Sequence, residues 1–74
     1  MKEKRYRIFY PDGTYWIVSA RSIPLAFQIA KQREIDDFEE WGDPVETPTG
    51  KIEVEVYNRK TRYSWVQVGG PAEL

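Results

Sequence analysis

The sequence predicts a small α+β domain of the order ββαββ, in which about four strands form one antiparallel sheet and one helix packs across one face. Two observations carry this prediction. Apolar and polar residues alternate on both sides of a turn near the N-terminus and again toward the C-terminus, and an apolar stripe with helical spacing lies between them. The 74 residues suffice for one domain, near the lower size limit for independent folding. We therefore treat residues 1–74 as a single small domain.

The first two strands are predicted from the segment Tyr10-Pro-Asp-Gly-Thr14. Pro, Asp and Gly in this order suit a type I turn closed by a left-handed glycine, which forms a three-residue hairpin loop. Such a loop would pair Tyr10 with Thr14, Ile8 with Trp16, and Tyr6 with Val18. We expect the helix to cover the face formed by Tyr6, Ile8, Trp16, Val18 and Ala20, and to leave open the face formed by Arg5, Arg7, Phe9, Tyr15 and Ile17.

The helix is predicted from Ser22 to Arg33. The Ser22 hydroxyl can accept a hydrogen bond from a backbone N–H of the first turn, and Pro24 falls in that turn, where its missing N–H is not needed. Lys31 would then lie near the C-terminal end with Arg33, where the macrodipole favours positive charge. The apolar face is formed by Ile23, Ala26, Phe27 and Ala30, with Leu25 and Ile29 widening it.

Two interpretations remain open for Ile35–Trp41, because the segment could prolong the helix by one or two turns or begin a loop. Gly42, Asp43 and Pro44 end any helix. We expect residues 36–50 to form an acidic loop, part of which Phe38 and Trp41 hold against the domain.

The second hairpin is predicted from Lys51–Tyr57, a turn at residues 58–61, and a strand over residues 62–68. In the first of these strands Ile52, Val54 and Val56 point inward. The last strand has two possible registers, with either Tyr63 and Trp65 or Val66 and Val68 facing the helix. We favour the valines, which leaves Trp65 exposed. Residues 69–74 are expected to form a flexible tail.

The net charge of −1 conceals a strong asymmetry along the chain. Residues 1–35 carry seven Lys or Arg against three acidic residues, whereas residues 36–50 carry six acidic residues and no basic one. Such a run is an acidic insert in an otherwise mildly basic domain. It favours a partner with a basic surface.

The composition argues against catalysis. His and Cys are absent, which removes Ser-His and Cys-His nucleophile pairs and most zinc sites. The acidic run lacks the spacing of a calcium-binding EF-hand, and no glycine-rich phosphate loop is present. We therefore expect a protein that is not an enzyme and that uses no metal and no cofactor. Since no apolar run resembles a signal peptide or approaches the roughly 20 residues of a membrane span, we expect a cytoplasmic protein that binds no membrane.

The open sheet face admits three interpretations. Its aromatic and basic side chains could bind single-stranded nucleic acid by stacking and phosphate contacts. They could form a protein-binding surface, since Tyr, Trp and Arg are enriched at interface hot spots. They could also be covered, either by residues 36–50 or by a second subunit in a homodimer. Of the two binding interpretations we place protein binding before nucleic-acid binding, because phosphate binding needs a basic footprint and the whole chain is slightly acidic. The covered face stays open as the alternative to both.

The junction between the second strand and the helix carries the pattern V-x-A-x-S-x-x-x-A-x-x-x-A, formed by Val18, Ala20, Ser22, Ala26 and Ala30. With the ββαββ order over residues 5–68, this pattern resembles small phage-encoded proteins of the anti-CRISPR type. The resemblance implies a phage or mobile-element inhibitor, acting in the cytoplasm of a bacterial host, that occludes the nucleic-acid-binding surface of a CRISPR-Cas complex. The acidic insert departs from that layout, so no functional residue is transferred.

The expected partner is thus a host protein or nucleoprotein complex with a basic surface, with nucleic acid or a second copy of the chain as alternatives. The candidate partner-binding residues are Asp36, Asp37, Glu39, Glu40 and Asp43 in the acidic segment, and Arg5, Arg7, Phe9, Tyr15, Tyr57 and Trp65 on the open face.

Overall fold

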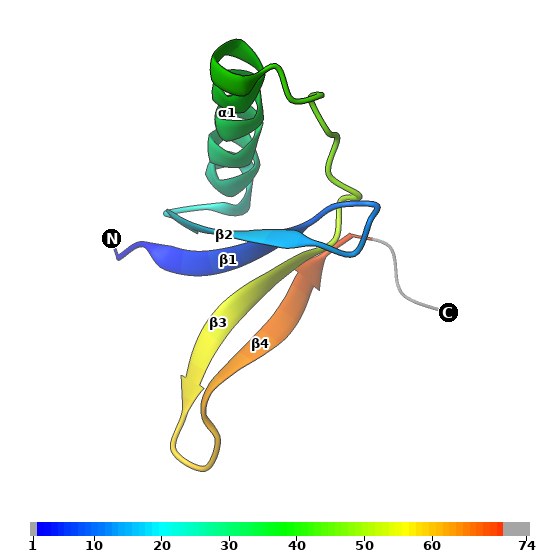
Figure 1. The fold of residues 1–74 in the computed structure, drawn as a ribbon. Helices are drawn as coiled ribbons and strands as arrows, with labels where there is room; N and C mark the ends of the chain where they lie inside the picture. The colour runs from blue at the N-terminus through cyan, green and yellow to red at the C-terminus, as the bar shows by residue number, and fades with distance from the viewer. Residues whose placement is uncertain (1, 71–74) are drawn as a thin grey trace.

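The computed structural model describes residues 2–70 and confirms the ββαββ order (Figure 1). A single antiparallel sheet has the strand order β2-β1-β3-β4, and α1 packs against β1 and β2. The elements are β1 (Lys4–Phe9), β2 (Tyr15–Ala20), α1 (Ile23–Trp41), β3 (Ile52–Asn58) and β4 (Arg62–Gly69).

The first hairpin has the predicted register, in which Ile8 lies opposite Trp16 and Tyr6 opposite Val18. The Tyr10 N–H donates to the Thr14 carbonyl at 2.9 Å, and Gly13 has a φ of +86°, which is the left-handed conformation that the loop requires. The Asp12 carboxylate accepts hydrogen bonds from the Thr14 hydroxyl and N–H, which lower the pKa of Asp12 below its usual value.

The helix begins as predicted but ends later. The Ser22 hydroxyl accepts a hydrogen bond from the Leu25 N–H at 3.3 Å, and α1 continues through Ile35 to Trp41. It stops at Gly42, which has a φ of 74° and donates its N–H to the Phe38 carbonyl at 2.9 Å. The expectation of an acidic loop from residue 36 is therefore wrong. Of the six acidic residues in segment 36–50, Asp36, Asp37, Glu39 and Glu40 lie within the helix and only Asp43 and Glu46 follow it.

The later helix end also changes the charge at the C-terminus of α1. Lys31 and Arg33 lie well before the end, and the last turn holds no basic residue. Glu39 and Glu40 are placed there instead, at the negative end of the helix macrodipole. This placement of negative charge is unfavourable for the isolated domain.

The core lies between α1 and the β1–β2 side of the sheet. Ile8 and Ile52 are fully buried at its centre, and Ala26 and Ala30 allow the helix to approach the strands closely. The remaining buried hydrophobic residues are Tyr6, Tyr10, Val18, Ala20 and Val54, with Trp16, Ile23, Phe27 and Val56 packed against them. Apart from Tyr10, these are predicted inward-facing residues, so the predicted inner face is confirmed. Leu25 and Ile29, which were expected to widen the apolar face of the helix, instead remain 42% and 37% exposed.

The β3–β4 hairpin extends away from the helix (Figure 1). Val66 lies opposite the buried Val54, so the favoured register with the valines on the helix side is confirmed. Val66 and Val68 nevertheless remain 46% and 42% exposed, because α1 packs against β1 and β2.

The expectation of an exposed Trp65 is wrong, since this side chain is half-buried on the opposite face. Gly69 ends β4, and residues 71–74 of the predicted tail lie outside the described residues.

Candidate binding surfaces

The outer sheet face, defined as the face turned away from α1, is organised around Arg7. Its guanidinium carbon lies 4.1 Å from the ring centroid of Trp65 and 4.9 Å from that of Tyr15. Phe9 packs against Tyr15 at a centroid distance of 5.4 Å. The register brings these side chains from β1, β2 and β4 onto one face. Arg7, Phe9, Tyr15 and Trp65 therefore form one cluster, as predicted.

Both arginines of the outer face are paired with carboxylates of β3. The Arg5 Nη1 atom lies 3.3 Å from Glu55 Oε2, and the Arg7 Nη1 atom lies 3.6 Å from Glu53 Oε1. Each positive charge therefore faces a negative one. A phosphate group would have to compete with these carboxylates. This arrangement disfavours the nucleic-acid interpretation of the outer face.

Tyr57 lies toward the tip of the β3–β4 hairpin rather than in the Arg7 cluster. Its ring packs against that of Tyr63 with a centroid distance of 5.3 Å, and the two side chains are 66% and 65% exposed.

The segment after α1 does not cover the outer face. Val45 and Pro48 line a cavity with Phe27 of the helix, on the other side of the sheet. The interpretation in which residues 36–50 cover this face is therefore wrong.

A second surface, which we call the acidic end, is formed by the last two turns of α1 and the segment that follows. It contains Glu34, Asp36, Asp37, Glu39, Glu40, Asp43 and Glu46. Within residues 2–70, none of these carboxylates forms an ion pair. Phe38 and Trp41 lie among them and are 53% and 70% exposed, which contradicts the expectation that they anchor this segment to the domain.

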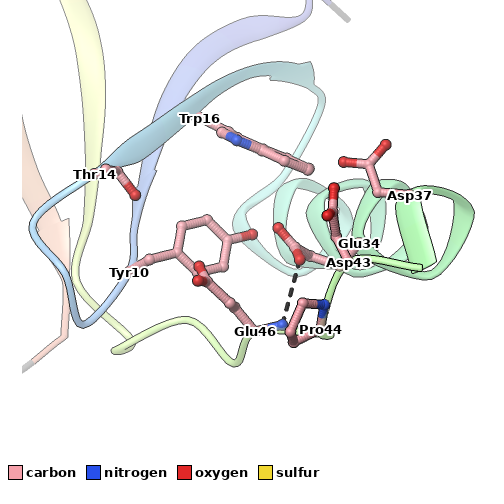
Figure 2. A pocket seen from close by; sticks show the side chains of 8 residues that line it. All are labelled: Tyr10, Thr14, Trp16, Glu34, Asp37, Asp43, Pro44 and Glu46. Atoms are coloured by element: carbon pink, nitrogen blue, oxygen red, sulfur yellow. Dashed lines mark hydrogen bonds between the residues drawn. The ribbon is translucent and has the colours of Figure 1, made fainter. Parts of the chain in front are cut away.

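The acidic end borders a pocket of about 320 Å³ between α1, the first hairpin and the segment after the helix (Figure 2). Two of the predicted residues, Asp37 and Asp43, line this pocket, whereas Asp36, Glu39 and Glu40 do not. The other lining residues are Tyr10, Thr14, Trp16, Glu34, Pro44 and Glu46.

Tyr10 and Glu34 give the pocket its buried polar groups. Tyr10 is only 2% exposed, and its hydroxyl has no hydrogen-bond partner among the described residues. Burial, followed by the nearby charges of Glu34 and Glu46, raises the pKa of Tyr10 to about 12. Glu34 is 7% exposed, and its carboxylate accepts a hydrogen bond from the Glu46 N–H at 3.3 Å.

Sequence reasoning did not select Tyr10, Trp16, Glu34 or Glu46 as site residues. One signal was available, because Glu34 follows Ala26 and Ala30 at four-residue spacing and so places a carboxylate on the stripe that faces the sheet. The eleven predicted residues therefore fall on two separate surfaces, the acidic end on the helix side and the outer face on the other.

Within the described chain, no three acidic residues are arranged to hold a metal ion. None of the helices in residues 2–70 is long and apolar enough to cross a membrane. No family model, curated protein or solved structure matches this chain.

Proposed function

We propose that this chain is a non-enzymatic protein-binding module that docks its acidic end onto a basic surface of a partner. The observation that carries the proposal is the set of seven carboxylates at the negative end of α1, none of which has an ion-pair partner within residues 2–70. A basic partner would supply the missing counter-charges and would be steered toward this end of the molecule.

The arrangement of negative charges at the acidic end lowers the stability of the free protein. Asp36 is spaced three and four residues from Glu39 and Glu40 on the helix, where like charges repel by about 0.2–0.5 kcal/mol per pair. Negative charge in the last helical turn adds a further cost of about 0.3–1 kcal/mol through the macrodipole. Local arrangements that oppose folding are typical of functional surfaces. A partner with Lys and Arg would remove both penalties on binding.

Phe38 and Trp41 supply the apolar part of such an interface. Both are more than half exposed and lie between the acidic residues of the last helical turns. Large aromatic side chains that become buried at the centre of an interface contribute strongly to affinity, whereas exposed charges mainly set orientation and rate. Electrostatic attraction and aromatic anchors are thus available on one surface.

The partner that we propose in particular is the nucleic-acid-binding surface of a bacterial CRISPR-Cas complex, with this chain as a phage or mobile-element inhibitor. This particular assignment is supported by the ββαββ layout and the strand-to-helix pattern that resemble small anti-CRISPR proteins. Its physical basis is that a surface built to hold nucleic acid is basic, and so complements the acidic end.

Affinity capture from a bacterial lysate tests the proposal. The wild type is compared with a variant in which Asp36, Asp37, Glu39 and Glu40 are replaced by Lys. We expect the wild type to retain a protein with a basic surface, the variant to lose it, and added salt to weaken capture. A matched control replaces Arg59 and Lys60, at the β3–β4 turn, by Glu and should capture normally. Equal capture of the same partner by the four-Lys variant would refute docking through the acidic end.

A further inference from the structure

The pocket under the acidic end has the composition of a site for an organic cation. Four carboxylates line it, from Glu34 and Asp37 on α1 and from Asp43 and Glu46 after the helix. Within the described residues none of them is in an ion pair. The carboxylates come from two separate segments and line an open pocket of about 320 Å³, which exceeds the space that a single ion needs.

Tyr10 provides an independent indication that the pocket receives a ligand. Its ring is 2% exposed, yet Figure 2 shows its hydroxyl pointing into the pocket toward the carboxylates. The hydroxyl oxygen is buried without a partner among the described residues. A buried hydroxyl is normally hydrogen-bonded, because leaving it unpaired is costly. A ligand with N–H donors would satisfy the two lone pairs of this oxygen.

Trp16 indicates the shape of the cation. Its ring lines the pocket, and the guanidinium carbon of Arg33 lies 4.7 Å from the ring centroid. This ring is therefore in an environment that accepts a planar guanidinium over an aromatic face. Arg33 forms no ion pair with the carboxylates of the described chain, although its charge acts on the pKa of Tyr10 in the opposite sense to the charges of Glu34 and Glu46.

We propose that this pocket binds the guanidinium group of one arginine side chain of the partner protein, a proposal that rests on docking through the acidic end. The guanidinium would donate to the Tyr10 hydroxyl and to the carboxylates of Glu34 and Glu46, beside the Trp16 ring. Its five N–H donors in one plane match acceptors that lie on different elements. An ammonium group is a compact point charge without this planar fork of donors, so we expect it to bind more weakly.

A nuclear magnetic resonance titration of the full chain tests this inference. Methylguanidinium and methylammonium chloride serve as probes at constant ionic strength. We expect methylguanidinium to give saturable shifts of the Trp16 indole N–H and of the backbone amides of Glu34, Asp37 and Glu46, and methylammonium to bind several-fold more weakly. An acetylated Gly-Arg-Gly peptide should reproduce these shifts, and the same peptide with neutral citrulline in place of arginine should not.

Two variants test the contribution of the buried groups. Tyr10→Phe and Glu34→Gln should each weaken methylguanidinium binding by about tenfold, because a hydrogen bond to a charged donor is lost. Tyr6→Phe is the matched control, since Tyr6, which lies on β1, is also buried but does not line the pocket, and it should bind normally. The amide spectrum of each variant verifies that it is folded.

The inference is overturned if methylguanidinium shifts are unsaturable or are spread over the whole surface. It is also overturned if methylammonium binds equally well, or if Tyr10→Phe and Glu34→Gln bind like the wild type. The experiments distinguish a pocket that does not bind arginine from a chain that does not dock through its acidic end. If the four-Lys variant loses partner capture while methylguanidinium does not bind, the acidic end docks the partner without an arginine in the pocket.

Discussion

Replacing Tyr10 by Phe should stabilise the free protein while it weakens binding. The Tyr10 hydroxyl is buried without a hydrogen-bond partner among the described residues, and an unpaired buried hydroxyl costs about 1–3 kcal/mol. Phe retains the ring, which packs edge-on against Trp16 at a centroid distance of 5.9 Å. We therefore expect a gain of about 1 kcal/mol in the free energy of unfolding, at the lower end of this range.

Thermal unfolding followed by circular dichroism measures this gain at neutral pH. For a domain of this size, about 1 kcal/mol corresponds to an increase in Tm of roughly 4–8 °C. Tyr6→Phe is again the matched control and should change Tm little. A lower free energy of unfolding for Tyr10→Phe would contradict this expectation, because the hydroxyl would then be making a favourable interaction in the free protein.

The pH dependence of stability gives a second test of the same residue. The pKa of Tyr10 is about 12 in the folded protein and 10.0 in the reference state, mainly because burial disfavours the phenolate. A raised folded-state pKa gives stability that is complete below pH 10 and lost as the pH rises toward 12. The loss should reach about 2–3 kcal/mol, from about 1.4 kcal/mol per pKa unit. Tyr10→Phe should lack this part of the alkaline decline, and an unchanged decline would contradict the cause assigned here.

Three further predictions concern the helix, the core and the outer face. Ser22→Ala removes the hydrogen bond to the Leu25 N–H and should lower the free energy of unfolding by about 1 kcal/mol in urea titrations; no loss would mean that this cap is not formed in solution. Ile8→Ala empties a fully buried position and should cost about 2–5 kcal/mol, enough to unfold much of so small a domain; a native circular dichroism melt would contradict the assignment of Ile8 to the core. Single-stranded oligonucleotides should not bind at low salt, because Glu53 and Glu55 neutralise the two arginines of the outer face; salt-sensitive binding that Arg7→Ala abolishes would overturn this expectation.

Local signals were sufficient to predict most of the elements. The Tyr10–Thr14 turn chemistry determined the register of the first hairpin, and Ser22 with Pro24 located the helix start, since each depends on residues adjacent in the chain. The helix end was harder, because Asp36, Asp37, Glu39 and Glu40 oppose the macrodipole there and so resemble a loop sequence. Gly42, which was identified as a helix terminator, marks the actual end.

The candidate site was less predictable because it depends on tertiary placement. The grouping of Arg7, Tyr15 and Trp65 followed from strand alternation, but the ion pairs that neutralise Arg5 and Arg7 required β3 to lie beside β1. The pocket was not predicted because Tyr10 and Glu34 are 24 positions apart and meet only when α1 crosses the hairpin. No local sequence pattern predicts how α1 lies across the sheet.

The most direct test of docking through the acidic end is a nuclear magnetic resonance footprint of the captured partner on the isotope-labelled chain. We predict that signals of residues 34–46 and of the Trp16 indole broaden or shift on binding, whereas the amides of Arg5, Arg7 and Trp65 on the outer sheet face stay unchanged. A footprint on the outer face that leaves residues 34–46 unaffected would contradict the account.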